Sequence, residues 1–144
     1  MNRTKIVVPF ELIPGNEVPI IKFYLDKEPR YAIIDTGAES TVFDKSIRHL
    51  LTITSQDDVS IVGLSGENES SMIETAKTKI WMHNNSKQIG ILNVCGFITD
   101  LTHLSSHFLR NCNDKKLSAI LGTDMLNEFN ADIDFINQEV TFKL

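Results

Sequence analysis

Short apolar stretches separated by Gly, Pro, Asn and Asp recur along the chain, a pattern typical of β-rich proteins. Extended segments are predicted at residues 6–13 and 18–25, on either side of a turn at 14–16. A second turn is predicted at 26–29. The four consecutive apolar residues at 31–34 predict a strand that is buried on both faces.

The rest of the chain continues this β pattern. Residues 59–64 and 71–82 flank a polar, Gly-containing segment at 65–68, which predicts a long hairpin. Other apolar or strictly alternating segments predict strands at 89–98, 119–121, 131–135 and 140–144, the last two joined through Asn137 and Gln138. Residues 101–113 are compatible with either a helix or an irregular segment.

Two short helices are expected between the strands. Asp44 can cap the first and Thr123 the second, because both residue types accept hydrogen bonds from the free amides of a helix start. Each helix has one apolar face, formed by Ile47, Leu50 and Leu51 in the first and by Met125, Leu126 and Phe129 in the second.

Composition indicates a single globular domain over residues 1–144. Hydrophobic residues make up 42% of the chain and charged residues 23%, and no apolar run is long enough for a transmembrane helix. The net charge of −5 differs from the basic character of proteins that bind nucleic acid or anionic membranes. We therefore expect no nucleic acid and no membrane among the partners.

Cysteine usage and the N-terminal residues bear on the compartment. Cys95 and Cys112 form no disulfide framework and no Cys-x-x-Cys motif, so two buried thiols are expected. The apolar part of the N-terminal segment stops at Glu11, too early for a signal peptide. We expect a cytoplasmic protein, or an exported one whose signal is absent from this sequence.

Asp35 is the residue that most needs a chemical explanation. It directly follows a buried apolar segment, where a carboxylate costs several kcal/mol unless it is hydrogen-bonded or functional. Gly37 would allow a positive φ and a close approach of another backbone. The hydroxyl of Thr36 could bind the backbone of a facing copy. Alternatively, Asp35 only accepts hydrogen bonds from its own turn.

An internal echo connects this segment with a later one. Residues 32–37, AIIDTG, and residues 119–124, AILGTD, share one plan: an apolar strand, a Gly-containing turn and then a helix. The repeat suggests internal pseudo-symmetry.

Several motifs together resemble one protein family. The run AIIDTGAESTV at residues 32–42 closely resembles the active-site segment of retropepsin-like aspartic proteases. ILGTDML at 120–126 is similar to their second signature, and IVGLSG at 61–66 lies where they carry a flap. FITDL at 97–101 resembles a segment of the bacterial-type members. The resemblance extends from about Val18 to Leu144.

This resemblance implies an all-β closed barrel with a flap hairpin and one or two short helices. It also implies an aspartic endopeptidase that hydrolyses peptides without a cofactor or metal. Only one Asp-Thr-Gly occurs in the chain, so a homodimer would pair two copies of Asp35 across a two-fold axis. A water between the two carboxyls would be activated, because such a pair shares one proton.

The same resemblance assigns supporting roles. Thr36 would bind across the dimer, and Gly37 would accept the substrate backbone. The remaining substrate-binding positions are Ala38 and Glu39 in the Asp loop and Gly63, Leu64, Ser65 and Gly66 in the flap. Thr123 stands where retroviral members carry an Arg that ties the dimer together, so the dimer contacts are expected to differ.

A rival interpretation is a non-catalytic module on the same fold that dimerises or binds an extended peptide without cutting it. The Asp-Thr-Gly-Ala run favours catalysis, because a pure binder needs no buried carboxylate.

Other candidate sites are weaker. His103 and His107, with Cys112 nearby, lack a convincing fourth ligand, so a solvated or structural role is expected rather than zinc binding. Trp81 is expected to pack on the sheet. The acidic residues of the long hairpin are expected to form a solvated face; they are Glu67, Glu69 and Glu74.

Overall fold

The computed structural model describes residues 4–15, 17–62, 68–104 and 115–144, with the backbone alone over the paired parts of 58–71. Ten strands follow one another along the chain: β1 (Lys5–Leu12), β2 (Pro19–Leu25), β3 (Glu28–Ile34), β4 (Val42–Asp44), β5 (Thr52–Val62), β6 (Asn68–Asn84), β7 (Lys87–Thr99), β8 (Leu117–Leu121), β9 (Asp132–Asp134) and β10 (Glu139–Lys143). A 3₁₀ helix, η1 (Lys45–Leu50), follows β4, and the α-helix α2 (Thr123–Glu128) follows β8.

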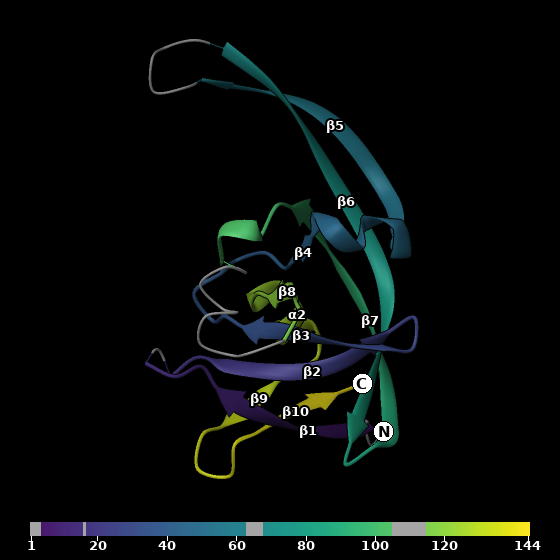
Figure 1. Cartoon of the computed structure of the whole chain (residues 1–144), viewed down its shortest axis with the longest axis vertical. Coiled ribbons are helices and arrows are strands. Elements are labelled where there is room, and N and C mark those ends of the chain that lie inside the picture. Colours follow the sequence, from purple (N-terminus) through teal and green to yellow (C-terminus); the bar gives the residue numbers. More distant parts are fainter. Residues whose placement is uncertain (1–3, 16, 63–67, 105–114) are drawn as a thin grey trace.

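Six of these strands close into a barrel in the order β6, β7, β4, β8, β3, β2. The ring closes where β2 pairs with β6, with Phe23 opposite Met82 and Tyr24 opposite Trp81. β1, β10 and β9 extend the sheet from β2, and β5 extends it from β6 (Figure 1). The predicted closed, all-β barrel is confirmed.

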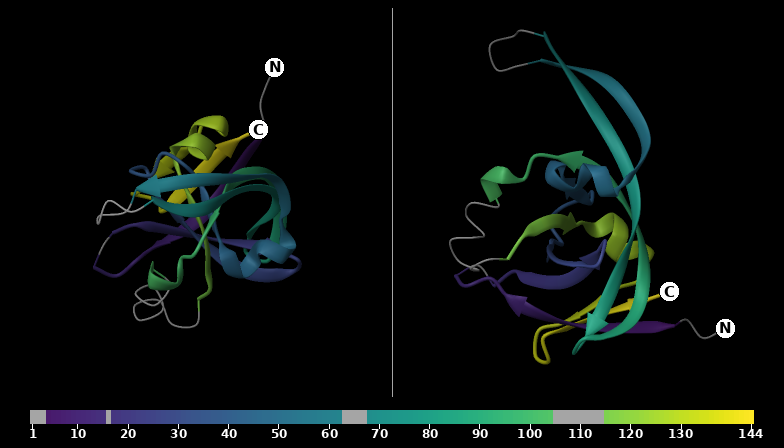
Figure 2. Two further views of the ribbon diagram at one scale, coloured as in Figure 1. Left: turned by 90° about the horizontal axis from the view of Figure 1, so that it is seen from above. Right: turned by 45° about the vertical axis from the view of Figure 1, so that its right-hand side comes forward.

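The long hairpin predicted in the middle of the chain is also confirmed. β5 and β6 pair antiparallel from Thr52 and Lys77 at the base to Val62 and Asn68 at the far end. Figure 2 shows the pair arching beyond the barrel above η1 and β4. The connecting residues 63–67 lie outside the described residues.

Alternation along the strands fills the barrel. In β10 the buried residues Val140 and Phe142 alternate with more exposed ones, as the sequence predicts for a half-buried strand. Phe142 contacts Phe129 edge to face, with ring centroids 6.0 Å apart. The largest fully buried side chains come from most of the strands: Phe23, Phe43, Phe142, Ile6, Ile21, Met82, Leu92 and Leu121.

Two details of the N-terminal strands differ from the predictions. The turn between β2 and β3 has only two residues, Asp26 and Lys27, which both have positive φ, as tight hairpins require. β3 is not buried throughout, because Tyr31 and Ile33 are half-buried and pack on a small second apolar cluster. The strand thus contributes Ala32 to the main core and Ile33 to the second cluster.

Helix capping follows the prediction at one site and not at the other. The side chain of Asp44 accepts the amide of Ser46 at 3.2 Å and begins η1, although this helix is 3₁₀ rather than α. Thr123 is not a cap, because Gly122 occupies that position and no side chain caps α2. Met125, Leu126 and Phe129 pack on the main core, as predicted.

The cysteine expectation is wrong for Cys95. This residue is free and exposed, since it lies on the outer face of β7 between the inward Val94 and Gly96. Cys112 lies outside the described residues. In the described part of the chain no helix has the length and apolarity needed to cross a membrane.

Candidate active site

Asp35 begins the loop that follows β3. β3 and β8 run parallel, with Ile34 opposite Leu121, and the amide of Asp35 continues the ladder by donating to Leu121 at 3.0 Å. The echo in the sequence therefore corresponds to two neighbouring strands that end together. This geometry places the Asp loop, residues 35–41, beside the start of α2.

The loop is a tight turn built around the Asp35 carboxylate. Its Oδ1 accepts the amide of Gly37 at 2.9 Å, and its carbonyl accepts the amide of Ala38 at 3.2 Å. Oδ2 makes no hydrogen bond to any residue that the structure describes, and Asp35 is partly exposed. The turn thus holds one carboxylate oxygen and leaves the other available for an additional partner.

Gly37 does not have the expected left-handed conformation; among the described glycines, Gly15 alone has a positive φ. A Cβ at Gly37 would lie 3.3 Å from Oδ1 of Asp35. A small residue therefore suits this position because of the carboxylate that folds over it, not because of its own backbone angles.

A polar contact between the buried Thr41 and the exposed Asp124 fixes the far end of the loop. Thr41 is 0% exposed. Its amide donates to both carboxylate oxygens of Asp124 at 3.0 Å, and its hydroxyl donates to Oδ1 of Asp124 at 2.7 Å. The same hydroxyl accepts the amide of Gly122 at 3.0 Å. Thr41 thereby connects the loop to both the end of β8 and the first turn of α2.

Backbone bonds connect the middle of the loop to α2. The amide of Thr123 donates to the carbonyl of Ala38 at 2.8 Å, and the amide of Asp124 donates to that of Glu39 at 3.3 Å. Two amides that a helix start leaves unpaired are thus satisfied by the loop. Gly122 is required by this contact, because a Cβ there would lie 2.7 Å from the carbonyl carbon of Ser40.

The structure places the predicted Asp-loop residues on one short segment. Thr36, Gly37 and Glu39 are exposed, and Ala38 is partly buried. The predicted flap residues lie outside the described residues; they are Gly63, Leu64, Ser65 and Gly66.

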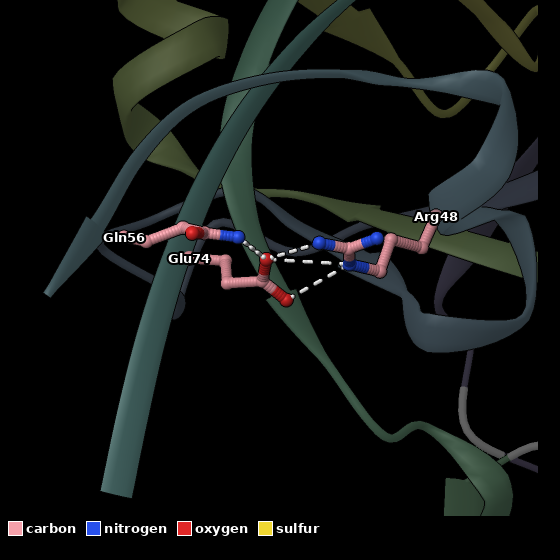
Figure 3. A network of polar contacts seen from close by, with 3 residues as sticks. All are labelled: Arg48, Gln56 and Glu74. Carbon is pink, nitrogen blue, oxygen red and sulfur yellow. Dashed lines mark hydrogen bonds and ion pairs between the residues drawn. The ribbon is translucent and has the colours of Figure 1, made fainter. Parts of the chain in front are cut away.

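A charged contact joins η1 to the base of the β5–β6 hairpin (Figure 3). The Glu74 carboxylate accepts Nε of Arg48 at 3.0 and 3.2 Å, Nη2 of Arg48 at 2.6 Å and Nε2 of Gln56 at 2.8 Å. The hydrogen bonds from Arg48 and then from Gln56 lower the pKa of Glu74 to about 2. The expectation of a solvated face is therefore wrong for Glu74, while the Glu67 and Glu69 side chains lie outside the described residues.

Thr41, Gly122 and Asp124 lie within the sequence motifs, but the sequence did not predict the hydrogen bonds between them. The signal in the sequence was the echo between residues 32–37 and 119–124, whose strands β3 and β8 do pair side by side. The predicted plan of strand, turn and helix holds only for the second segment, because β4 follows the Asp loop and α2 follows β8. A hydrogen bond between residues that are 83 positions apart produces no periodic pattern in the sequence, so it could not be recognised there.

The described residues include no group of three or more His, Cys, Asp and Glu side chains that could hold a metal ion. His103 is exposed, and His107 and Cys112 lie outside the described residues.

Comparison with known proteins places this chain in a family. The family model for retroviral aspartyl protease matches residues 16–134. No curated protein matches the chain. A retropepsin-like aspartic protease from Rickettsia conorii is similar in structure, with a TM-score of 0.42, 16% identity and coverage of 97% of this chain and 90% of that one.

Two further solved structures are similar. The retroviral protease-like domain of Ddi1 from Leishmania major has a TM-score of 0.43 and 14% identity, over 87% of this chain and 91% of that one. The structure of edgp has a TM-score of 0.51 and 9% identity, over 99% of this chain and 46% of that one. At sequence identities this low, structural similarity shows only that the folds are alike. The family model covers most of the sequence, and the chain belongs to the retroviral aspartyl protease family.

Proposed function

We propose that this protein is an aspartic endopeptidase, in which a homodimer hydrolyses peptide bonds with a water held between two Asp35 carboxyls. The observation that carries the proposal is the environment of Asp35. One of its oxygens is held by the Gly37 amide, and the other has no partner among the described residues. The loop around it is fixed by bonds to β8 and α2.

A dimer is proposed because one chain supplies one such aspartate. Thr36 and Gly37 are exposed beside Asp35, so the loop can meet an identical loop across a two-fold axis. In this arrangement the Thr36 hydroxyl binds the facing loop and holds the two carboxyls together.

Two carboxyls in such proximity do not both ionise, as is general for aspartic protease dyads. The ionised Asp35 takes a proton from the water as its oxygen attacks the peptide carbonyl carbon. The protonated Asp35 donates its proton to the carbonyl oxygen. The tetrahedral intermediate then collapses as the C–N bond breaks: the departing amine takes the proton that the first Asp35 accepted from the water, and the second Asp35 takes a proton back from a hydroxyl of the intermediate, which leaves a carboxylic acid and restores the shared proton. No acyl-enzyme forms.

In this proposal the substrate peptide is bound between the β5–β6 hairpin and the Asp loop. The β5–β6 hairpin acts as the flap, which lies over an extended peptide and excludes water beneath it. Gly37, Ala38 and Glu39 contact the peptide main chain from the barrel side. The contacts of Arg48 and Gln56 with Glu74 support the base of this flap.

The test is cleavage of a mixed peptide library between about pH 3 and pH 7, where a shared proton gives a bell-shaped profile. Asp35→Asn should lower the cleavage rate by about 10²- to 10⁴-fold, the range of general acid–base catalysis. Asp132→Asn is the control, because Asp132 is an exposed aspartate on β9 and lies outside the Asp loop. An inactive wild-type protein that still binds peptides would support the non-catalytic module. Equal cleavage by Asp35→Asn would contradict the mechanism.

A further inference from the structure

The outer face of β6 carries a row of basic and aromatic side chains. Lys77, Lys79 and Trp81 are exposed, while the alternate residues Ile80 and Met82 are buried in the barrel. His83 continues the outward row and is half-buried. Trp81 lies on a strand, as expected, and its side chain is 39% exposed.

An aromatic hollow lies at one end of this row. Trp81 is opposite Tyr24 where β2 and β6 close the barrel, and the rings of Tyr24 and His83 have centroids 4.0 Å apart. The hollow has a volume of about 520 Å³. Its lining combines these rings with hydrogen-bonding groups: Tyr24, Asp26, Lys27, Trp81, His83 and Gln88. Its volume is in the usual range for small-molecule sites, about 300–1,000 Å³.

A basic hollow lies at the other end of the row. It has a volume of about 480 Å³, and its lining includes Lys77, Lys79 and Asn93. In the described part of the chain, neither these two lysines nor Lys22 and Lys27 form an ion pair with a carboxylate. These lysines therefore give the face positive charge that no ion pair among the described residues neutralises, on a chain whose net charge is −5; Asp26 is the one carboxylate that lines the aromatic hollow.

We propose that this face, defined by Tyr24, Lys77, Lys79, Trp81 and Lys27, binds single-stranded nucleic acid. A base stacks on Trp81 in the aromatic hollow, and Lys77 and Lys79 contact the adjoining phosphates. Aromatic platforms beside a basic groove are what single strands require, because bases present π-faces and the backbone is anionic. An acidic peptide would use the lysines but would leave the aromatic hollow without a role.

The face is separate from the Asp loop. Tyr24 is opposite Pro29 near the β2–β3 turn, whereas Asp35 follows the other end of β3. The inference therefore does not rest on peptide hydrolysis, and Asp35→Asn should bind nucleic acid as the wild type does. This proposal departs from the expectation of no nucleic-acid partner. That expectation was based on the net charge alone, because the sequence does not show which lysines share a face.

The fluorescence of Trp81 gives a direct test, because it is the only tryptophan in the sequence. Titration with an oligothymidylate of about ten nucleotides should quench it saturably, as stacking requires. Raising the salt concentration from about 50 mM to about 200 mM should weaken the binding, because phosphate contacts release counterions. No quenching, or equal competition by an oligoglutamate of the same length, would overturn the proposal.

Variants separate this face from general electrostatics. Lys79→Glu should weaken binding of a labelled oligothymidylate by about tenfold or more, measured by fluorescence anisotropy. Lys116→Glu makes the same charge change just before β8, which lies opposite β6 in the six-stranded ring, and should leave binding close to that of the wild type. Equal losses from both variants would overturn the proposal.

Substitutions of the aromatic residue complete the test. Trp81→Ala should weaken binding by roughly 5- to 150-fold, and Trp81→Phe should retain most of it, because stacking needs an aromatic face. Circular dichroism of both variants checks the fold. Equal binding by a folded Trp81→Ala variant would show that no base stacks there.

Discussion

Thr41 and Asp124 lie 83 residues apart in the sequence and form a partly buried contact, in which the amide and the hydroxyl of Thr41 both donate to the Asp124 carboxylate. This contact holds the end of the Asp loop against the first turn of α2. Because Thr41 also accepts the amide of Gly122, one side chain connects three segments. The position of Asp35 therefore depends on residues that take no part in the proposed chemistry.

Removing the Thr41 hydroxyl should destabilise the protein. Thr41→Val keeps the side-chain shape but leaves the Gly122 amide without its acceptor, and we expect a loss of about 1–3 kcal/mol in the free energy of unfolding. Urea denaturation measures it. Thr41→Ser retains the hydroxyl and is the matched control, which should lose less stability than Thr41→Val. The reverse order would contradict the role assigned to the hydroxyl.

Gly122 should tolerate no side chain. A Cβ there would lie 2.7 Å from the carbonyl carbon of Ser40 and 2.8 Å from the carbonyl oxygen of Ala38, and these backbone atoms cannot rotate away. We expect Gly122→Ala to lower stability by about 1–3 kcal/mol. Gly37→Ala is the comparison, because its Cβ would meet only a side-chain oxygen at 3.3 Å. Similar unfolding midpoints for the two variants would contradict this difference.

The hydrogen bonds to the Glu74 carboxylate should make the free energy of unfolding depend on pH in the acid range. The folded pKa of Glu74, about 2, lies below its ordinary value of 4.5, so the unfolded chain binds the proton more readily. The stabilisation is thus fully present above the ordinary value and is lost as the pH falls toward 2. Because Gln carries no charge to lose, Glu74→Gln should be less stable than the wild type near neutral pH, and this difference should shrink in acid.

Thermal unfolding at several pH values measures this effect. Glu139→Gln is the control, because Glu139 is exposed on β10 and should show no such pH-dependent difference. A difference between Glu74→Gln and the wild type that stays constant down to pH 2 would contradict the assignment.

The proposed dimer should weaken when Thr36 is shortened. Each lost hydrogen bond contributes about 0.5–1.5 kcal/mol, so Thr36→Ala should raise the dimer dissociation constant by about tenfold across a two-fold interface. Sedimentation velocity over a dilution series measures the constant. Thr52→Ala, at the start of β5, provides a threonine control. An unchanged constant for Thr36→Ala would remove this residue from the interface.

Much of the fold could be predicted from local patterns. The alternation of apolar and polar residues in β10 indicated a strand that is buried on one face. The continuous apolar run in β8 indicated a strand that is buried on both faces. The prediction of full burial was wrong for Ile33, which is half-buried and packs on the second apolar cluster rather than in the main core.

The contacts that position the site could not be predicted in this way. Arg48 and Glu74 come from different elements, 26 residues apart, and only the barrel brings them together. Cys95 was expected to be buried because the residue type often is, but its outward position follows from the register of β7. The roles of Gly63 to Gly66 stay predictions, because these residues lie outside the described part.

The most direct test of the account measures peptide cleavage by mixtures of wild-type and Asp35→Asn chains at constant total concentration, with the chains exchanged by refolding together. If each active site needs two Asp35 residues from two subunits, activity should fall with the square of the wild-type fraction, to about one quarter in an equal mixture. Activity that falls linearly, to about one half, would mean that each chain acts alone and would contradict the paired-carboxylate mechanism.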